Sequence, residues 1–170
     1  MGLVQWIAVA VALQRLGELV LSRRNEKRLL AAGGREVGAG HYPLIVLLHA
    51  AWLAALFLAV PEDAPVSWGL LGFFLLLQGL RLWTIASLGP YWTARIVTLP
   101  GAPLSTRGPY RWMRHPNYLI VAAEIALLPL AFGAWGISVL FSLANGGLLA
   151  WRIRIENRIL EERRVSPNSH

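Results

Sequence analysis

Long apolar stretches alternate with short polar stretches along the whole chain. Five of them qualify as membrane spans, which need about 20 mostly apolar residues, although the last two are shorter. We place these spans at residues 3–21, 42–60, 68–88, 118–132 and 135–151. Only Gly133 and Ala134 separate the last two, which predicts a tight antiparallel hairpin. The pattern therefore predicts an all-α integral membrane protein with five transmembrane helices in a single domain.

The composition favours the same class of protein. Hydrophobic residues make up 56% of the chain, charged residues only 15%, and the mean hydropathy is +0.51. Because soluble domains carry about 25% charged residues, a soluble fold of this composition would lack polar surface to cover itself. The eight Trp and four Tyr suit membrane–water interfaces. The absence of cysteine excludes disulfides, thiolate metal ligands and a cysteine nucleophile.

The basic residues are distributed asymmetrically between the predicted loops. Fourteen of the 16 lie in the segments that follow the first, third and fifth spans, whereas the loop at 61–66 carries Glu62 and Asp63. The positive-inside rule then places the N-terminus outside and the C-terminus in the cytoplasm. This distribution accounts for the net charge of +7 without a nucleic-acid partner.

Four charged residues lie within the predicted spans. Arg15 and Glu18 are one helical turn apart and can pair, near a span end from which they can also reach the interface. Glu124 lies deeper, so its carboxylate should face the bundle interior or a wet cavity. Glu124 either contacts a substrate or cofactor, or makes a buried structural hydrogen bond, for which Arg81 is the candidate partner.

The predicted cytoplasmic segment 88–118 reads LGPYWTARIVTLPGAPLSTRGPYRWMRHPNY. Its five prolines break any long helix, and ordered loops of this length are more often functional. Exposed backbone N–H groups in such a loop can hold a nucleotide-like ligand. His115 has no second His or Cys at metal-ligand spacing, so we expect no metal site.

The segment 151–164, WRIRIENRILEERR, continues the last span into the cytoplasm. Arg152 and Glu156 are four residues apart and share a helix face, opposite the proline-rich loop. The alternative is a charged amphipathic tail that lies on the membrane surface.

Two sequence blocks resemble the isoprenylcysteine carboxyl methyltransferase family, membrane enzymes that use S-adenosylmethionine. The first block is Arg107-Gly108-Pro109-Tyr110 followed by RHPNY at residues 114–118. The second is Arg152-Ile153 with Glu156 and Leu160, similar to the family's R-I-x-x-E-E-x-x-L, although Asn157 replaces the second Glu. The resemblance covers roughly residues 68–162. It implies two N-terminal spans (1–67), a methyltransferase core (68–164) and a tail (165–170).

The resemblance also implies a site. Arg152 would hold the acidic group of a lipophilic substrate, with Glu124 as a further substrate-contact candidate. Arg152, Glu156 and His115 are the candidate catalytic residues. A carboxylate or acidic enol needs no strong base, whereas a phenol would need His115 or Glu124 to accept its proton. The residues expected to bind S-adenosylmethionine come from the loop, the start of the fourth span and the final helix: Arg95, Ala102, Pro103, Leu104, Ser105, Tyr110, His115, Pro116, Asn117, Tyr118 and Glu156.

The N-terminal third is similar to a short bacterial branch of the family, some members of which methylate alkylpyrones or alkylresorcinols. In that reading His41 and His49 face the substrate; otherwise they are an interfacial and a core histidine. The expected reaction is methyl transfer to a carboxylate, enol or phenol of an isoprenylcysteine-type or polyketide lipid. Two alternatives stay open. One is an NADPH-dependent membrane lipid reductase, because sterol reductases share RHPNY, and the other is a non-catalytic membrane scaffold.

Overall fold

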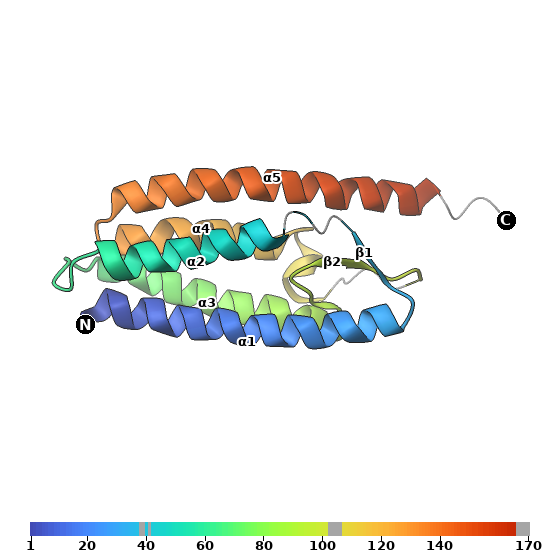
Figure 1. Ribbon diagram of the computed structural model, residues 1–170, viewed down its shortest axis with the longest axis horizontal. Coiled ribbons are helices and arrows are strands. Elements are labelled where there is room, and N and C mark those ends of the chain that lie inside the picture. Colours follow the sequence, from blue (N-terminus) through green and yellow to red (C-terminus); the bar gives the residue numbers. More distant parts are fainter. Residues whose placement is uncertain (38–39, 41, 102–106, 166–170) are drawn as a thin grey trace.

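In the computed structural model, the described part of the chain forms five α-helices that run side by side along an elongated bundle (Figure 1). The structure describes residues 1–37, 40, 42–101 and 107–165, and side chains as far as residue 158. The start of α1 and the end of α5 lie at opposite ends of the bundle (Figure 1). The helices are α1 (Leu3–Ala31), α2 (Tyr42–Ala59), α3 (Trp68–Leu88), α4 (Pro116–Ala131) and α5 (Trp135–Val165).

Four of these helices, α1, α2, α3 and α5, are long and apolar enough to cross a membrane. The fourth predicted span corresponds to α4, whose 16 residues extend about 24 Å, less than the roughly 30 Å of a hydrocarbon core. The predicted bounds of α3 agree residue for residue. The first and fifth predicted spans are the apolar parts of longer helices, which continue to Ala31 and Val165 without a break.

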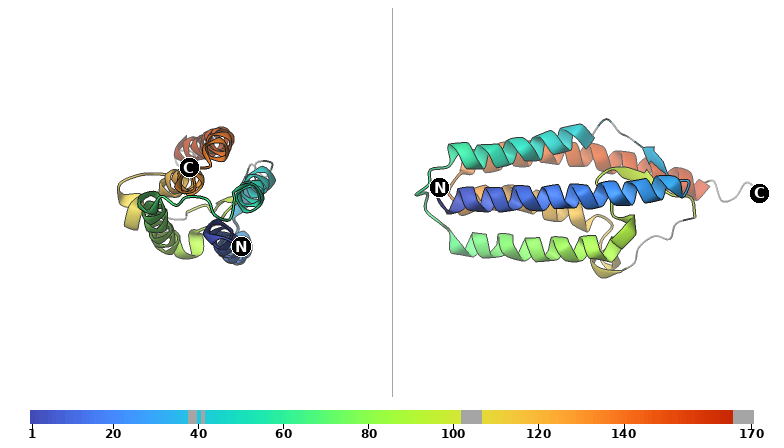
Figure 2. Two further views of the ribbon diagram at one scale, coloured as in Figure 1. Left: turned by 90° about the vertical axis from the view of Figure 1, so that its left-hand side faces the viewer. Right: turned by 60° about the horizontal axis from the view of Figure 1, so that its bottom comes forward.

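The shortest helix is the most deeply packed. Eight of the 16 residues of α4 are buried. In the most apolar 18-residue stretch of each of the four longer helices, only 11–28% of the residues are buried. In the end-on view of Figure 2, α4 lies between α3 and α5. The outward positions of the longer helices carry Leu13, Leu47, Leu76 and Leu143, all more than 60% exposed. Such an apolar outer surface fits lipid rather than water.

The turn between α4 and α5 is the tight hairpin that the sequence predicts. α4 ends at Ala131, Gly133 adopts a φ of +69°, and α5 begins at Trp135. A positive φ is unstrained only for glycine, which is why the chain can reverse within so few residues. The two helices that carry the candidate site are thereby held as antiparallel neighbours.

The prediction of an all-α fold needs one correction. Strand β1 (Arg35–Val37) pairs antiparallel with β2 (Ile96–Thr98), and Arg35 lies opposite Thr98. Two 3₁₀ helices, η2 (Gly89–Tyr91) and η3 (Gly108–Arg111), flank this part of the chain. Three-residue strands are too short to produce a readable alternation of polar and apolar residues. Their pairing also joins segments about sixty positions apart, which no local pattern reveals.

Candidate active site

One end of the bundle collects the segments that the sequence singles out. The last turns of α1, both strands, η2, η3, the first turn of α4 and the second half of α5 all lie there (Figure 1). We call this part, the described residues 22–37, 88–101, 107–118 and 151–158, the basic end. The described part of the proline-rich loop and the C-terminal half of α5 therefore lie at the same end, which a site shared between them needs.

The centre of the basic end is a cluster of four side chains from α5 and the start of α4. The Tyr118 hydroxyl donates to Glu156 Oε1, and Arg152 Nε donates to the Tyr118 oxygen over 2.6 Å. Glu156 also lies 3.3 Å from Arg152 Nε and 3.3 Å from His115 Nδ1. The carboxylate of Glu156 is thus held from three sides by groups that the sequence predicted for one site.

Two ring contacts fix the same cluster. The rings of His115 and Tyr118 are stacked, with centroids 5.2 Å apart and planes 10° from parallel. The Arg152 guanidinium lies over the Tyr118 ring at 5.2 Å, within the range of cation–π attraction. Because His115 immediately precedes α4 and Pro116 occupies its first turn, the helix start itself sets where the imidazole lies.

The backbone of the loop completes the coordination of Arg152. Its Nη1 donates to the carbonyl oxygen of Ala94 over 2.7 Å, and the side chain is only 10% exposed. Within the described residues Nη2 makes no hydrogen bond to protein. The hydrogen bonds of Nε and Nη1 fix the orientation of the guanidinium.

The Arg-Gly-Pro-Tyr block packs against α3 through η3. Gly108 has a φ of +55°, and a Cβ there would lie 2.1 Å from Ser87 Oγ and 2.9 Å from Ser87 Cβ. Only glycine fits. Burial raises the pKa of the Tyr110 phenol to about 12, and the Glu156 carboxylate acts in the same direction. Tyr110 therefore lies within electrostatic reach of the cluster and stays neutral at physiological pH.

Arg95, a candidate cofactor ligand, turns toward α1 and β1. It lies 3.0 Å from Glu36 and 3.9 Å from Glu26, and its guanidinium is 4.7 Å from the centre of the Tyr42 ring. The Glu36 carboxylate raises the pKa of Arg95. Arg95 lines a surface groove beside α1 and has no direct contact with Arg152 or Glu156 among the described residues. The groove is lined by Arg23, Glu26, Lys27, Leu30, Glu36, Arg95 and Val97.

The other candidate cofactor residues are only partly described. Pro116 is buried, and the amide oxygen of Asn117 is buried without a hydrogen-bond partner among the described residues. Ala102, Pro103, Leu104 and Ser105 lie outside the described residues, as does His41.

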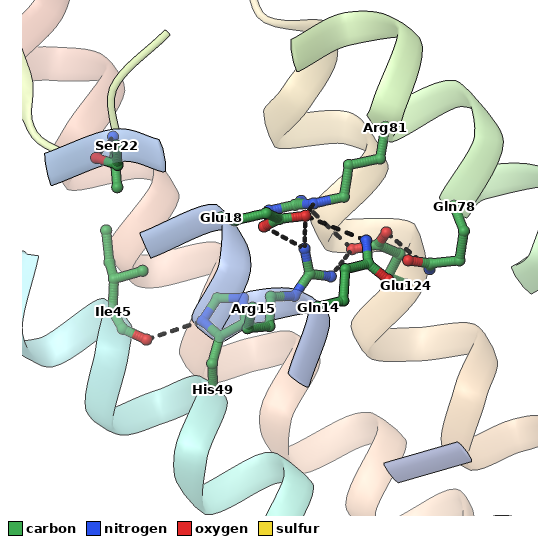
Figure 3. A network of polar contacts seen from close by, with 10 residues as sticks. Gln14, Arg15, Glu18, Ser22, Ile45, His49, Gln78, Arg81 and Glu124 are labelled. Atoms are coloured by element: carbon green, nitrogen blue, oxygen red, sulfur yellow. Dashed lines mark hydrogen bonds and ion pairs between the residues drawn. The ribbon is translucent and has the colours of Figure 1, made fainter. Parts of the chain in front are cut away.

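Glu124 lies in a second polar cluster, inside the bundle (Figure 3). It is 1% exposed and lies 2.6 Å from Arg15 Nη2 and 3.5 Å from Arg81 Nη1. Gln78 donates to its other oxygen over 2.9 Å. Glu18 pairs with Arg81 at 2.6 Å and with Arg15 at 3.0 Å. We call these side chains of Arg15, Glu18, Gln78, Arg81 and Glu124 the inner network.

The inner network joins α1, α3 and α4 with two positive and two negative charges. The predicted Arg15–Glu18 and Arg81–Glu124 contacts are both present, and both arginines point toward Glu124 inside the bundle. His49 lies beside the network on α2 and contacts the Ile45 carbonyl oxygen through Nδ1 at 2.8 Å (Figure 3). A substrate contact for Glu124 or His49 stays a prediction.

Sequence reasoning missed the contribution of α1 to the basic end. Ser22, Asn25 and Glu26 are buried and contact the backbone or side chains of residues 89–95. A signal was present in the sequence. Polar residues at positions 15, 18, 22, 25 and 26 follow helical spacing, so they mark one polar face of a helix that continues beyond residue 21, where the predicted span ends.

Comparison with known proteins settles the family. The family model of isoprenylcysteine carboxyl methyltransferases matches residues 70–162, which include both blocks and the cluster just described. The chain belongs to this family. An uncharacterized Bacillus subtilis protein, YpbQ, is 39% identical over 162 residues, covering 92% of this chain and 96% of its own. An uncharacterized Haemophilus influenzae protein is 28% identical over 110 residues, 62% of this chain and 64% of its own. No solved structure matches.

Membership of the isoprenylcysteine carboxyl methyltransferase family indicates a membrane methyltransferase. The matched region begins within α3 and ends in α5, so α1 and α2 lie outside it. The N-terminal helices nevertheless supply contacts to the basic end and two members of the inner network.

Proposed function

We propose that this protein transfers a methyl group from S-adenosylmethionine to an acidic oxygen of a lipophilic substrate at the basic end of the bundle. The observation that carries the proposal is the meeting of Arg152, Glu156, Tyr118 and His115 beside the Ala94 carbonyl. Two sequence segments of the family match contribute these residues, and the fold brings them within hydrogen-bond distance.

The residues present fit a cationic, nucleotide-like cofactor. Glu156 supplies a carboxylate, the stacked His115 and Tyr118 rings supply an aromatic surface, and the buried amide oxygen of Asn117 has no partner among the residues that the structure describes. Hydrogen-bond acceptors beside aromatic rings suit a ligand that combines positive charge with an adenine ring. When bound, S-adenosylmethionine supplies an electrophilic methyl group on its sulfonium.

Arg152 is the residue that we assign to the methyl acceptor. Its Nε donates to the Tyr118 oxygen and its Nη1 donates to the Ala94 carbonyl. These two independent hydrogen bonds fix the direction in which Nη2 points. A guanidinium fixed in this way can orient an anionic oxygen for in-line attack at little entropic cost. His115 is the proton acceptor for a phenolic substrate, since its imidazole reaches the same carboxylate.

The lipophilic part of the substrate would lie among the spans. The outer surface of α1, α2, α3 and α5 is apolar, and the basic end sits directly beyond it. Five crossings, with the basic end in the cytoplasm, agree with the position of the arginines. Isoprenylcysteine-type lipids and alkylpyrones or alkylresorcinols are the candidate acceptors.

The test is methyl transfer by the purified protein in detergent with radiolabelled S-adenosylmethionine. A prenylated cysteine analogue and an alkylpyrone are offered side by side, and NADPH binding is measured in parallel. We expect label in one lipid product and no saturable NADPH binding. Affinity for NADPH without affinity for S-adenosylmethionine would replace the proposal with a lipid reductase, and no affinity for either would indicate a scaffold.

Variants connect the activity to the cluster. Arg152→Lys keeps the charge but loses the planar fork, and Glu156→Gln loses the carboxylate, so each should lower the transfer rate by the equivalent of about 2–5 kcal/mol. Arg154→Lys is the matched control, because Arg154 is exposed two positions along the same helix. Equal activity of all three variants would remove the cluster from the reaction.

A further inference from the structure

The segment that supplies the Ala94 carbonyl is held by α1. The Ala94 N–H donates to Ser22 Oγ over 2.8 Å, while the carbonyl of the same residue accepts from Arg152 Nη1 over 2.7 Å. Ser22 is fully buried, and its hydroxyl donates in turn to Glu26 Oε1 over 2.6 Å. One residue of the loop thus connects a side chain of α1 to the guanidinium on α5.

A second residue of α1 holds the same segment. Asn25 Nδ2 donates to the carbonyl oxygens of Trp92, at 2.8 Å, and Gly89, at 3.2 Å. Asn25 is 2% exposed and lies one helical turn after Ser22. Because an amide nitrogen can satisfy two carbonyls at once, Asn25 fixes the approach of the chain to Ala94.

We propose that Ser22 and Asn25 are positioning residues for Arg152, which they orient by fixing the Gly89–Ala94 segment. The inference rests on the proposed methyl-transfer function. Neither α1 residue contacts Arg152 directly. Their effect passes through the Ala94 peptide, whose N–H is held by α1 and whose carbonyl holds the guanidinium.

The proposal explains why α1 carries these buried polar groups just beyond its apolar part. A buried serine in a helix can satisfy its hydroxyl by donating to the carbonyl four residues earlier, but Ser22 Oγ bonds to Glu26 and Ala94 instead. The region outside the family match is thereby connected to the matched core. An error of about 1 Å in a positioned group can cost on the order of a hundredfold in rate.

The experiment compares Ser22→Ala and Asn25→Asp with wild type and with Ser142→Ala. Ser142 is a matched control, since its buried hydroxyl has no hydrogen-bond partner among the described residues. Ser22→Ala leaves the Ala94 N–H unpaired, and Asn25→Asp sets a carboxylate against two carbonyls. We expect kcat/KM for the lipid acceptor to fall about tenfold or more, with KM for S-adenosylmethionine within about twofold of wild type.

A double-variant comparison separates positioning from general damage. In an Arg152→Lys background, Ser22→Ala should have no further effect on kcat/KM, because the group that it orients is gone. An unchanged tenfold loss in that background would overturn the proposal, as would full activity of Ser22→Ala alone.

Two readouts do not depend on activity. Hydrogen exchange of a peptide that spans Ala94 should be faster in Ser22→Ala and unchanged in Ser142→Ala. Modification of Arg152 by phenylglyoxal should likewise be faster in Ser22→Ala. Absence of methyl transfer by wild type would refute the proposed function, and these two measurements would still decide whether Ser22 holds Ala94 and Arg152 in place. Unchanged exchange and unchanged modification would overturn the inference.

Discussion

Replacing Glu18 by Gln removes one of the two negative charges of the inner network. Glu18 accepts hydrogen bonds from Arg81 Nε at 2.7 Å and Nη2 at 2.6 Å, and it lies 3.0 Å from Arg15. The amide has nearly the same volume, so packing is retained. What changes is the charge balance, because Arg15 and Arg81 then share only Glu124.

The cost follows from burial. The side chains of Arg81 and Glu18 are 7% and 10% exposed, so bulk water screens little of the excess positive charge. Removing one partner of a buried ion pair costs about 3–5 kcal/mol. For a chain of this length each kcal/mol corresponds to roughly 2–4 °C, so the apparent Tm should fall by about 6–20 °C.

The assay is thermal unfolding in detergent, followed by size-exclusion chromatography of heated samples. Glu62→Gln is the matched control, because Glu62 also pairs with a cation, at 2.8 Å, but is 68% exposed. An exposed pair contributes about 1 kcal/mol or less. The double variant Glu18→Leu with Arg81→Leu restores neutrality and leaves the Arg15–Glu124 contact, so it should be more stable than Glu18→Leu alone. If Glu18→Gln unfolds at the temperature of Glu62→Gln, the reasoning is wrong.

Three further predictions concern the basic end. Gly108→Ala forces a positive φ on a residue with a Cβ that collides with Ser87, so it should lower the Tm and abolish transfer. Gly72→Ala lies within α3 with nothing inside 4 Å of the added Cβ, so it should lower neither the Tm nor the activity. Since burial raises the pKa of Tyr110 to about 12, the unfolded state loses this proton first, and stability should fall between about pH 10 and 12. Tyr110→Phe should reduce that fall in alkaline melting curves, and an identical curve would contradict the assignment. Glu36→Gln breaks an ion pair with Arg95, whose side chain is 40% exposed, so the unfolding free energy of the protein should change by less than about 1 kcal/mol. A larger loss in the melting experiment would mean that the pairing of β1 with β2 depends on this contact.

Local patterns in the sequence located all five helices, although they did not predict that α1 continues from residue 21 to Ala31. The apolar stretches predict α3 residue for residue and the α4–α5 hairpin at Gly133, since both depend on uninterrupted hydrophobicity and one glycine turn. The Arg152–Glu156 pair was predictable from its four-residue spacing. That the pair contacts the start of α4 follows from the hairpin, which makes the two helices antiparallel neighbours.

Contacts between distant segments could not be read from local pattern. The β1–β2 pairing and the hydrogen bond from Ala94 to Ser22 join residues about sixty to seventy positions apart. A role for Arg95 in cofactor binding stays a prediction, whereas its contacts with Glu36 and Glu26 depend on how α1 ends and could not be read from the local sequence. The partners of Glu124 were open for the same reason, because three helices must be placed before its neighbours are known.

The length of each arm of the α4–α5 hairpin, counted from Gly133, determines which residues of the site face one another. Tyr118 and Arg152 lie on its two arms, so their meeting depends on the number of residues between each of them and the bend. Inserting one residue into either arm would rotate everything beyond it by about 100° and separate the phenol from the guanidinium. Length variation among relatives should therefore be excluded from residues 118–152 and tolerated at residues 61–66, which connect α2 to α3 at the opposite end of the bundle.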